Sequence, residues 1–179
     1  MPTDTDALTL LKNDHAKVKT LFKRIEAGED QELVFEQIKA ALDVHATIEE
    51  EIFYPAVKKA RSTEVKDEVR EAYEEHKQIK TLLAAIADTS PGDESYSAKM
   101  AVLKEDVEHH VKEEEGEMFP DARKYLGDKL EALGAQMQER KDELQTNGEP
   151  KSKLSPSGRR GSGPNPPKPE KHSSKGETP

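Results

Sequence analysis

Six residues of two types interrupt the apolar faces of the four strongest helical patterns in this chain. Their types suit metal coordination, because imidazole nitrogen and carboxylate oxygen together bind first-row metals such as iron, manganese and zinc. A histidine followed four residues later by a glutamate places both side chains on one helix face, one turn apart. Two of the helical patterns carry this spacing at core positions, and one histidine comes from each of the two other patterns. The candidate ligands are His15, His45, Glu49, His76, His110 and Glu114.

Burial of these residues requires a compensating charge. An unpaired buried carboxylate costs several kcal/mol, and here two lie among histidines at core positions. Six ligands exceed the four of a tetrahedral zinc ion, and two carboxylates can bridge two ions about 3.5 to 4 Å apart. The set therefore predicts a two-metal site. Because the chain has no cysteine, disulfides, iron–sulfur clusters and thiolate sites are excluded, and copper(I) is disfavoured.

Taken singly, these residues have ordinary structural explanations. A lone core histidine is usually satisfied by its neighbours, and an acidic run such as Glu49 to Glu51 usually forms a solvated face. The conjunction favours metal binding, since each of four segments places one histidine at a core position and the carboxylates recur in matching halves.

Four amphipathic helices must position the candidate ligands. Apolar and ligand positions recur at three- and four-residue spacing over residues 8–25, 35–56, 65–86 and 96–119. Short connections make neighbouring helices antiparallel, so the predicted fold is all-α, an up-down-up-down four-helix bundle. A weaker pattern from Leu126 to Leu144 predicts a short C-terminal helix that packs outside the bundle or caps it. Pro55 and Pro120 are expected to kink or end the second and fourth helices.

An internal repeat relates the two halves of this bundle. Residues 14–21 (DHAKVKTL) resemble residues 75–82 (EHKQIKTL). Residues 45–55 likewise resemble residues 110–120, with His, Glu and Pro at matching places. A duplicated helix pair related by a pseudo-twofold axis is therefore expected.

Composition limits the remaining possibilities. The 179 residues are 32% hydrophobic, 36% charged and 4% aromatic, without tryptophan, which favours helices around one modest core. Residues 147–179 are rich in Pro, Gly, Ser and Lys and are predicted to form a disordered tail after a domain at residues 1–146. The net charge is −9, and the tail is basic. An acidic domain without a phosphate-binding loop or a Ser/His/Asp arrangement argues against nucleic-acid and nucleotide binding.

The N-terminus lacks the features of a secretory signal, and no run of about 20 apolar residues occurs. A cytoplasmic protein without a membrane partner is therefore expected. The tail, with Arg159-Arg160 and Pro166-Pro167, offers a contact for a protein partner, although a solubilising tail is the simpler interpretation.

From Leu8 to Tyr125 the chain resembles the hemerythrin family, in particular its bacterial HHE cation-binding branch. The resemblance rests on the order His, His-x-x-x-Glu, His, His-x-x-x-Glu, with a proline ten residues after the second and fourth histidines. It implies two non-haem irons joined by an oxo or hydroxo bridge, with manganese or zinc as lesser alternatives. By this resemblance, the carboxylates that bridge the two irons are Glu49 and Glu114. The ligands of one iron would be His15 and His45, and those of the other would be His76 and His110.

One position departs from the oxygen-carrying members, which have a second histidine where this chain has Lys80. Each six-coordinate iron would then keep one exchangeable position, which favours reaction with peroxide, O₂ or nitric oxide over reversible storage. The implied function is a di-iron protein of oxidative or nitrosative stress response. Whether it is an enzyme, a peroxidase-like or catalase-like oxidoreductase, stays open; the alternative is a non-catalytic oxygen, iron or redox sensing or metal-binding module.

Several other polar residues lie near the predicted ligands in the sequence. Tyr73, Glu50 and Glu115 are candidates for a fifth ligand or for hydrogen-bond partners of the ligands. His109 forms a shifted His-x-x-x-Glu pair with Glu113 but should point away from the core. His172 lies in the predicted tail.

Overall fold

The computed structural model describes residues 5–59 and 63–148, and every regular element in these ranges is helical. Four long helices form the body, namely α1 (Ala7–Glu26), α2 (Gln31–Ile48), α4 (Thr63–Ala87) and α5 (Glu94–Glu113). Two π-helical turns extend α2 and α5: η1 (Glu49–Phe53) leads into α3 (Tyr54–Lys59), and η2 (Glu114–Met118) leads into α6 (Phe119–Leu126). The last helix is α7 (Lys129–Gly148). The all-α prediction is confirmed, while the predicted tail lies outside the described residues from residue 149 onward.

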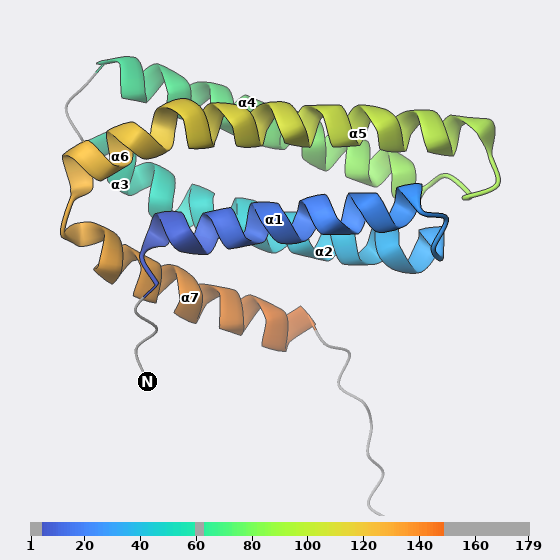
Figure 1. Cartoon of the computed structure of the whole chain (residues 1–179), viewed down its shortest axis with the longest axis horizontal. Coiled ribbons are helices and arrows are strands. Elements are labelled where there is room, and N and C mark those ends of the chain that lie inside the picture. The colour runs from blue at the N-terminus through green and yellow to red at the C-terminus, as the bar shows by residue number, and fades with distance from the viewer. Residues whose placement is uncertain (1–4, 60–62, 149–179) are drawn as a thin grey trace, which may run out of the picture. The chain divides into compact units, whose positions relative to one another are not determined.

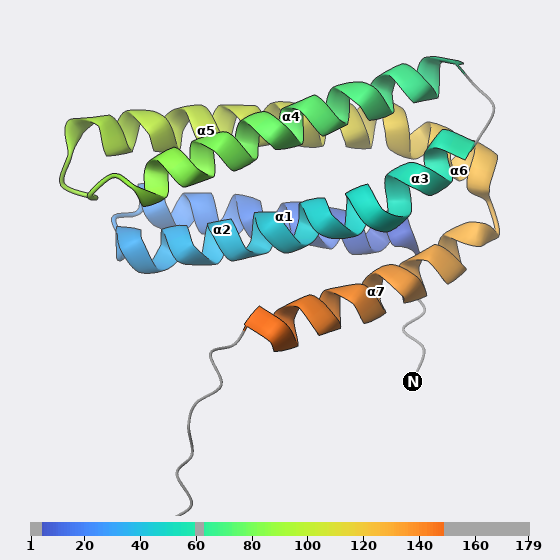
Figure 2. The same cartoon turned by 180° about the vertical axis from the view of Figure 1, so that it is seen from behind.

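The long helices form two antiparallel pairs, α1 with α2 and α4 with α5 (Figures 1 and 2). Aspartate side chains begin three of them by accepting a backbone N–H of the first turn: Asp6 from Thr9 at 2.8 Å, Asp30 from Leu33 at 3.0 Å and Asp93 from Ser95 at 2.8 Å. Gly28, with φ of 81°, lies directly beyond the end of α1, where glycine adopts a left-handed conformation without strain. The predicted up-down-up-down bundle is confirmed.

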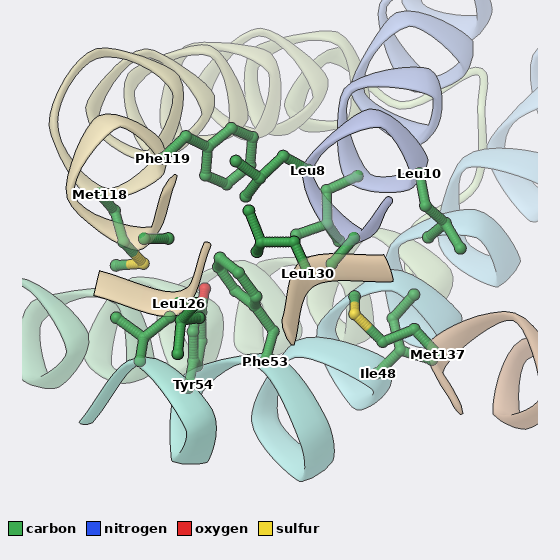
Figure 3. Packing of buried hydrophobic residues seen from close by; sticks show 14 of the residues in the cluster. Leu8, Leu10, Ile48, Phe53, Tyr54, Met118, Phe119, Leu126, Leu130 and Met137 are labelled. Atoms are coloured by element: carbon green, nitrogen blue, oxygen red, sulfur yellow. The ribbon is translucent and has the colours of Figure 1, made fainter. Parts of the chain in front are cut away.

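Two apolar clusters fill the bundle, one on each side of the candidate ligands. In α1, α2 and α4 a ligand position separates residues of the two clusters, as His15 lies between Leu11 and Val18, and His76 lies between Ala72 and Ile79. The cluster that includes the π turns and α7 is shown in Figure 3; its larger members are Leu8, Leu11, Ile48, Phe53, Tyr54, Met118, Phe119, Leu130 and Met137. The six polar residues are therefore held in the middle of a packed core.

Each His-x-x-x-Glu glutamate begins a π turn. The carbonyl of Glu49 accepts the N–H of Tyr54, and the carbonyl of Glu114 accepts the N–H of Phe119, in each case from five residues ahead. The next residues are Pro55 and Pro120, which have no N–H to donate to the preceding turn. A wider turn accommodates each proline, and the chain remains helical on both sides of it. Of the two expected outcomes, a kink or the end of the helix, the second does not occur.

Helix α7 packs outside the bundle against α1, α2 and η1, on the side away from α4 and α5 (Figures 1 and 2). This position confirms the predicted C-terminal helix. Among the described residues, no helix combines the length and the apolar character that crossing a membrane requires.

Close approach between α7 and the start of α1 depends on Gly134. A Cβ atom at this position would lie 2.8 Å from the backbone nitrogen of Ala7, and backbone cannot move aside cheaply. Gly134→Ala is therefore expected to lower the free energy of unfolding by about 1–3 kcal/mol, measured by urea denaturation. Gly92→Ala is the control, because nothing lies within 4 Å of its added Cβ. Equal losses in the two variants would contradict this account of α7 docking.

Candidate metal centre

The structure brings all six predicted ligand residues together in the middle of the bundle. They come from α1, α2, η1, α4, α5 and η2, and none is more than 7% exposed. Helical spacing explains the convergence, because each His-x-x-x-Glu pair presents both side chains to the same side of its helix. The members are His15, His45, Glu49, His76, His110 and Glu114.

The histidines form two pairs whose Nε2 atoms face each other. The Nε2 atoms of His15 and His45 are 3.2 Å apart, and those of His76 and His110 are 3.1 Å apart. The two carboxylates lie between these pairs. Glu49 Oε2 is 3.3 Å from Nε2 of both His45 and His76. Glu114 Oε2 is 3.3 Å from Nε2 of His15 and 3.5 Å from that of His110. Each carboxylate therefore reaches one histidine of each pair.

Each of the four central histidines has a carboxylate from outside the centre facing its Nδ1 atom. The Nδ1 to oxygen distances are 2.8 Å for His15 and Glu115, 2.9 Å for His76 and Glu50, 2.7 Å for His110 and Glu75, and 3.7 Å for His45 and Asp14. An ionised carboxylate only accepts hydrogen bonds, so Nδ1 carries the proton where the two bond, and the Nε2 lone pair points inward. Glu50 and Glu115 thus act as partners of histidines, one of the roles expected for them.

These four partners follow the internal repeat. Asp14 directly precedes His15, and Glu75 directly precedes His76. In the same way Glu50 follows Glu49, and Glu115 follows Glu114. Each therefore faces a histidine from another helix, while its own neighbour points into the centre. Glu50, Glu75 and Glu115 lie within hydrogen-bond distance of their histidines, whereas Asp14 lies 3.7 Å from His45 and makes no hydrogen bond to it. The predicted pseudo-twofold relation consequently extends to the residues that orient the imidazoles.

The inward-facing atoms fit cations and little else. Four imidazole Nε2 atoms and two carboxylates converge. A neutral imidazole protonated at Nδ1 and an ionised carboxylate both present acceptors there. Glu49 Oε1 and Glu114 Oε2 are buried and receive no hydrogen bond. Acceptors at 3.1 to 3.5 Å from one another repel unless a positive charge lies between them. His15, His45, Glu49 and Glu114 on one side, and Glu49, His76 and His110 on the other, bring ligand atoms within 4.8 Å of each other.

The pKa shifts of the centre differ between its members. At His15 and His110 burial lowers the pKa, but hydrogen bonds to carboxylates and the charge of Glu114 outweigh it, so both pKa values are raised. Burial, together with the charge of Glu114, raises the pKa of Glu49 well above its ordinary value. Burial also lowers the pKa of His45 to about 4, so its imidazole is neutral at neutral pH. Neutral imidazole is the form that binds a metal ion.

Tyr54 is a residue of the centre that the sequence analysis missed. Its hydroxyl donates to Glu114 Oε1 at 2.8 Å, lies 3.3 Å from His76 Nε2 and is fully buried. The internal repeat could have drawn attention to Tyr54, because its matching position, Phe119, is also aromatic. In the structure Phe119 stacks on His15, with ring centroids 5.9 Å apart. Each half places an aromatic ring beside a histidine, but only Tyr54 adds a hydroxyl.

Three other residues considered from the sequence lie outside the converging atoms. Tyr73 donates its hydroxyl to the backbone carbonyl of Glu50 at 3.1 Å. Lys80 Nζ contacts Glu50 Oε1 at 2.7 Å, so it supports the partner of a histidine and does not replace the missing ligand. His109 has a 61% exposed side chain and points away from the core, as predicted.

A small cavity of about 20 Å³ adjoins all four histidines. It is large enough for about one water-sized molecule. Its wall is mostly aliphatic and comes from the four long helices, with Val18, Leu42, Ile79, Leu83 and Val107 among the lining residues.

Comparison with known proteins agrees with the fold and identifies a cation-binding domain. The model of the hemerythrin HHE cation-binding domain matches residues 6–122. The uncharacterized protein Rv2633c of Mycobacterium tuberculosis is 28% identical over 145 residues, which are 78% of this chain and 87% of that protein. A protein of Nostoc sp. named DNA nickase is 32% identical over 126 residues, or 69% of this chain, but the chain spans only 35% of its length.

A solved structure is also similar. It is the crystal structure of a hemerythrin HHE cation-binding domain-containing protein, the Rv2633c homolog from Mycobacterium kansasii. The TM-score is 0.69 at 26% identity, and the match covers 79% of this chain and 88% of that one. The chain therefore belongs to the hemerythrin family of HHE cation-binding domains.

Proposed function

We propose that this chain is a non-haem di-iron protein that reacts with O₂, hydrogen peroxide or nitric oxide in the response to oxidative or nitrosative stress. The observation that carries the proposal is the convergence of four Nε2 lone pairs and two shared carboxylates beside a cavity for a very small molecule. Imidazole and carboxylate without sulfur suit iron, and two shared carboxylates suit two ions.

In this proposal His15 and His45 hold one ion and His76 and His110 hold the other. Glu49 and Glu114 would be shared between the two ions, since each lies within 3.5 Å of one histidine of each pair. Irons held there would supply electron transfer to the small molecule. The outer carboxylates orient the imidazoles, the aliphatic wall of the cavity limits access to water, and Tyr54 holds a proton at its hydroxyl, 2.8 Å from Glu114.

Metal content and absorption test the proposal directly. The chain, produced with iron, is expected to contain about two irons and to show an oxo-bridged diferric spectrum that changes when peroxide is added. A folded protein that binds no metal, or binds one ion only, would contradict it.

Turnover separates an enzyme from a sensor. Sustained loss of hydrogen peroxide, with iron retained, would support a catalase-like or peroxidase-like activity. A spectral change that occurs once per chain, without turnover, would instead support the sensing module.

The Tyr54 hydroxyl is expected to affect reactivity more than metal content. Tyr54→Phe removes a hydroxyl that donates to Glu114 Oε1, but leaves all six proposed ligands in place. A positioned proton donor contributes about 10²- to 10⁴-fold to a rate, so the iron-loaded variant should react with peroxide at least about tenfold more slowly, as measured by stopped-flow absorption. Tyr73→Phe is the control, because that hydroxyl contacts only a backbone carbonyl. Equal rates in the two variants would exclude this role for Tyr54.

A further inference from the structure

The four outer carboxylates differ in how their charge is balanced. Lys80 pairs with Glu50, and Lys141 of α7 pairs with Asp14. Within the described part of the chain, neither a lysine nor an arginine pairs with Glu75 or with Glu115. The Glu115 side chain is 36% exposed and therefore better solvated than that of Glu75. The Glu75 side chain is only 16% exposed, so solvent compensates its charge incompletely.

Other possible metal ligands converge on Glu75. His109 Nε2 lies 3.6 Å from Glu75 Oε1 and 3.1 Å from Glu113 Oε1. The ligand atoms of the three residues all lie within 4.8 Å of one another. Atoms bound tetrahedrally at about 2.0 to 2.2 Å from an ion lie about 3.4 Å apart. The observed spacings therefore suit one shared ion without a change of backbone.

The negative charge around this cluster is concentrated. No lysine or arginine among the described residues forms an ion pair with Glu113. A bound cation would relieve the repulsion between these carboxylates.

The internal repeat gives an independent reason to expect a cation here. Asp14 is the counterpart of Glu75, and its free side is occupied by the Lys141 ammonium. The counterparts of His109 and Glu113 in the first half are Val44 and Ile48, which cannot bind an ion. In the first half, the outer carboxylate Asp14 is therefore paired with a lysine. In the second half, the outer carboxylate Glu75 lies beside a histidine and a second carboxylate.

We propose that Glu75, His109 and Glu113 form a second, peripheral site on α4 and α5 for a divalent first-row cation such as Zn²⁺. One histidine and two carboxylates leave a fourth position for water, as in open zinc sites. The second oxygen of Glu75 accepts a hydrogen bond from His110 Nδ1 at 2.7 Å. A peripheral ion would withdraw charge from that carboxylate, so it would weaken the hydrogen bond that orients His110.

Zinc titration of the iron-loaded full chain tests the site, with iron content and the visible spectrum measured before and after. The wild type is expected to bind one zinc ion without loss of iron. His109→Ala and Glu113→Gln should each weaken zinc binding by at least about tenfold, since even outer partners of metal ligands contribute about 10- to 100-fold to affinity. Glu105→Gln, an exposed position on the same helix with the same change of charge, should bind zinc like the wild type.

Two outcomes would overturn the proposal. One is the absence of zinc binding to the iron-loaded wild type, and the other is equal affinity in all four proteins. Failure of the di-iron proposal is distinguishable, because a chain without iron would take zinc into the central residues in every variant. The additional loss caused by His109→Ala and Glu113→Gln would still report the peripheral site.

Discussion

Glu114→Ala is expected to empty the proposed di-iron centre while the helical bundle persists. One Glu114 oxygen lies 3.3 Å from His15 Nε2 and 3.5 Å from His110 Nε2, so its removal takes a ligand from both proposed ions. His76→Ala removes one of the two imidazoles of a single ion. Iron should fall from about two per chain to well below one in Glu114→Ala, measured by elemental analysis beside far-ultraviolet circular dichroism.

Exposed neighbours serve as controls for these substitutions. Glu105→Ala changes a carboxylate on the solvent side of α5, and Lys77→Ala changes the residue directly after His76, whose side chain is 75% exposed. Both controls should keep iron and the diferric spectrum. If Glu114→Ala and His76→Ala also kept both properties, the assignment of the ligands would be wrong.

The helices and the six converging residues were predictable because both depend on local spacing. The helical period shows which side chains share a face of a helix. On the buried faces of the four helical patterns, histidine and glutamate interrupt the run of apolar residues. Whether those interruptions met at one level of the bundle depended on helix length and on antiparallel pairing. The repeated order of the motif made that convergence predictable as well.

The π turns, the outer partners and Tyr54 required knowledge of tertiary contacts. A proline in a helical pattern indicates a lost hydrogen bond, but the chain restores pairing through a bond from Tyr54 to Glu49 five residues before it. Lys141 approaches Asp14 only because α7 folds back on α1, which no local pattern reports. Tyr54 resembled an ordinary core aromatic until its hydroxyl was located beside Glu114.

Glu49→Met is expected to stabilise the metal-free protein and to abolish its stabilisation by iron. The Glu49 side chain is fully buried, and one of its oxygens receives no hydrogen bond. A methionine of similar volume removes the desolvated carboxylate, and replacing buried charges by apolar groups often stabilises by about 1–4 kcal/mol. Iron at 100 times its dissociation constant would stabilise the wild type by about 2.7 kcal/mol. Urea denaturation with a chelator, and then with iron, measures both differences.

The pH dependence of this difference tests its cause. Because the pKa of Glu49 is raised above 4.5 in the folded chain, the protonated carboxyl favours folding. Its contribution is fully present below pH 4.5 and is lost as the pH rises through the folded pKa. The advantage of metal-free Glu49→Met over the metal-free wild type should therefore grow from pH 4.5 toward pH 7. An advantage that stayed constant over this range would attribute the gain to packing, because a change of packing alone does not titrate.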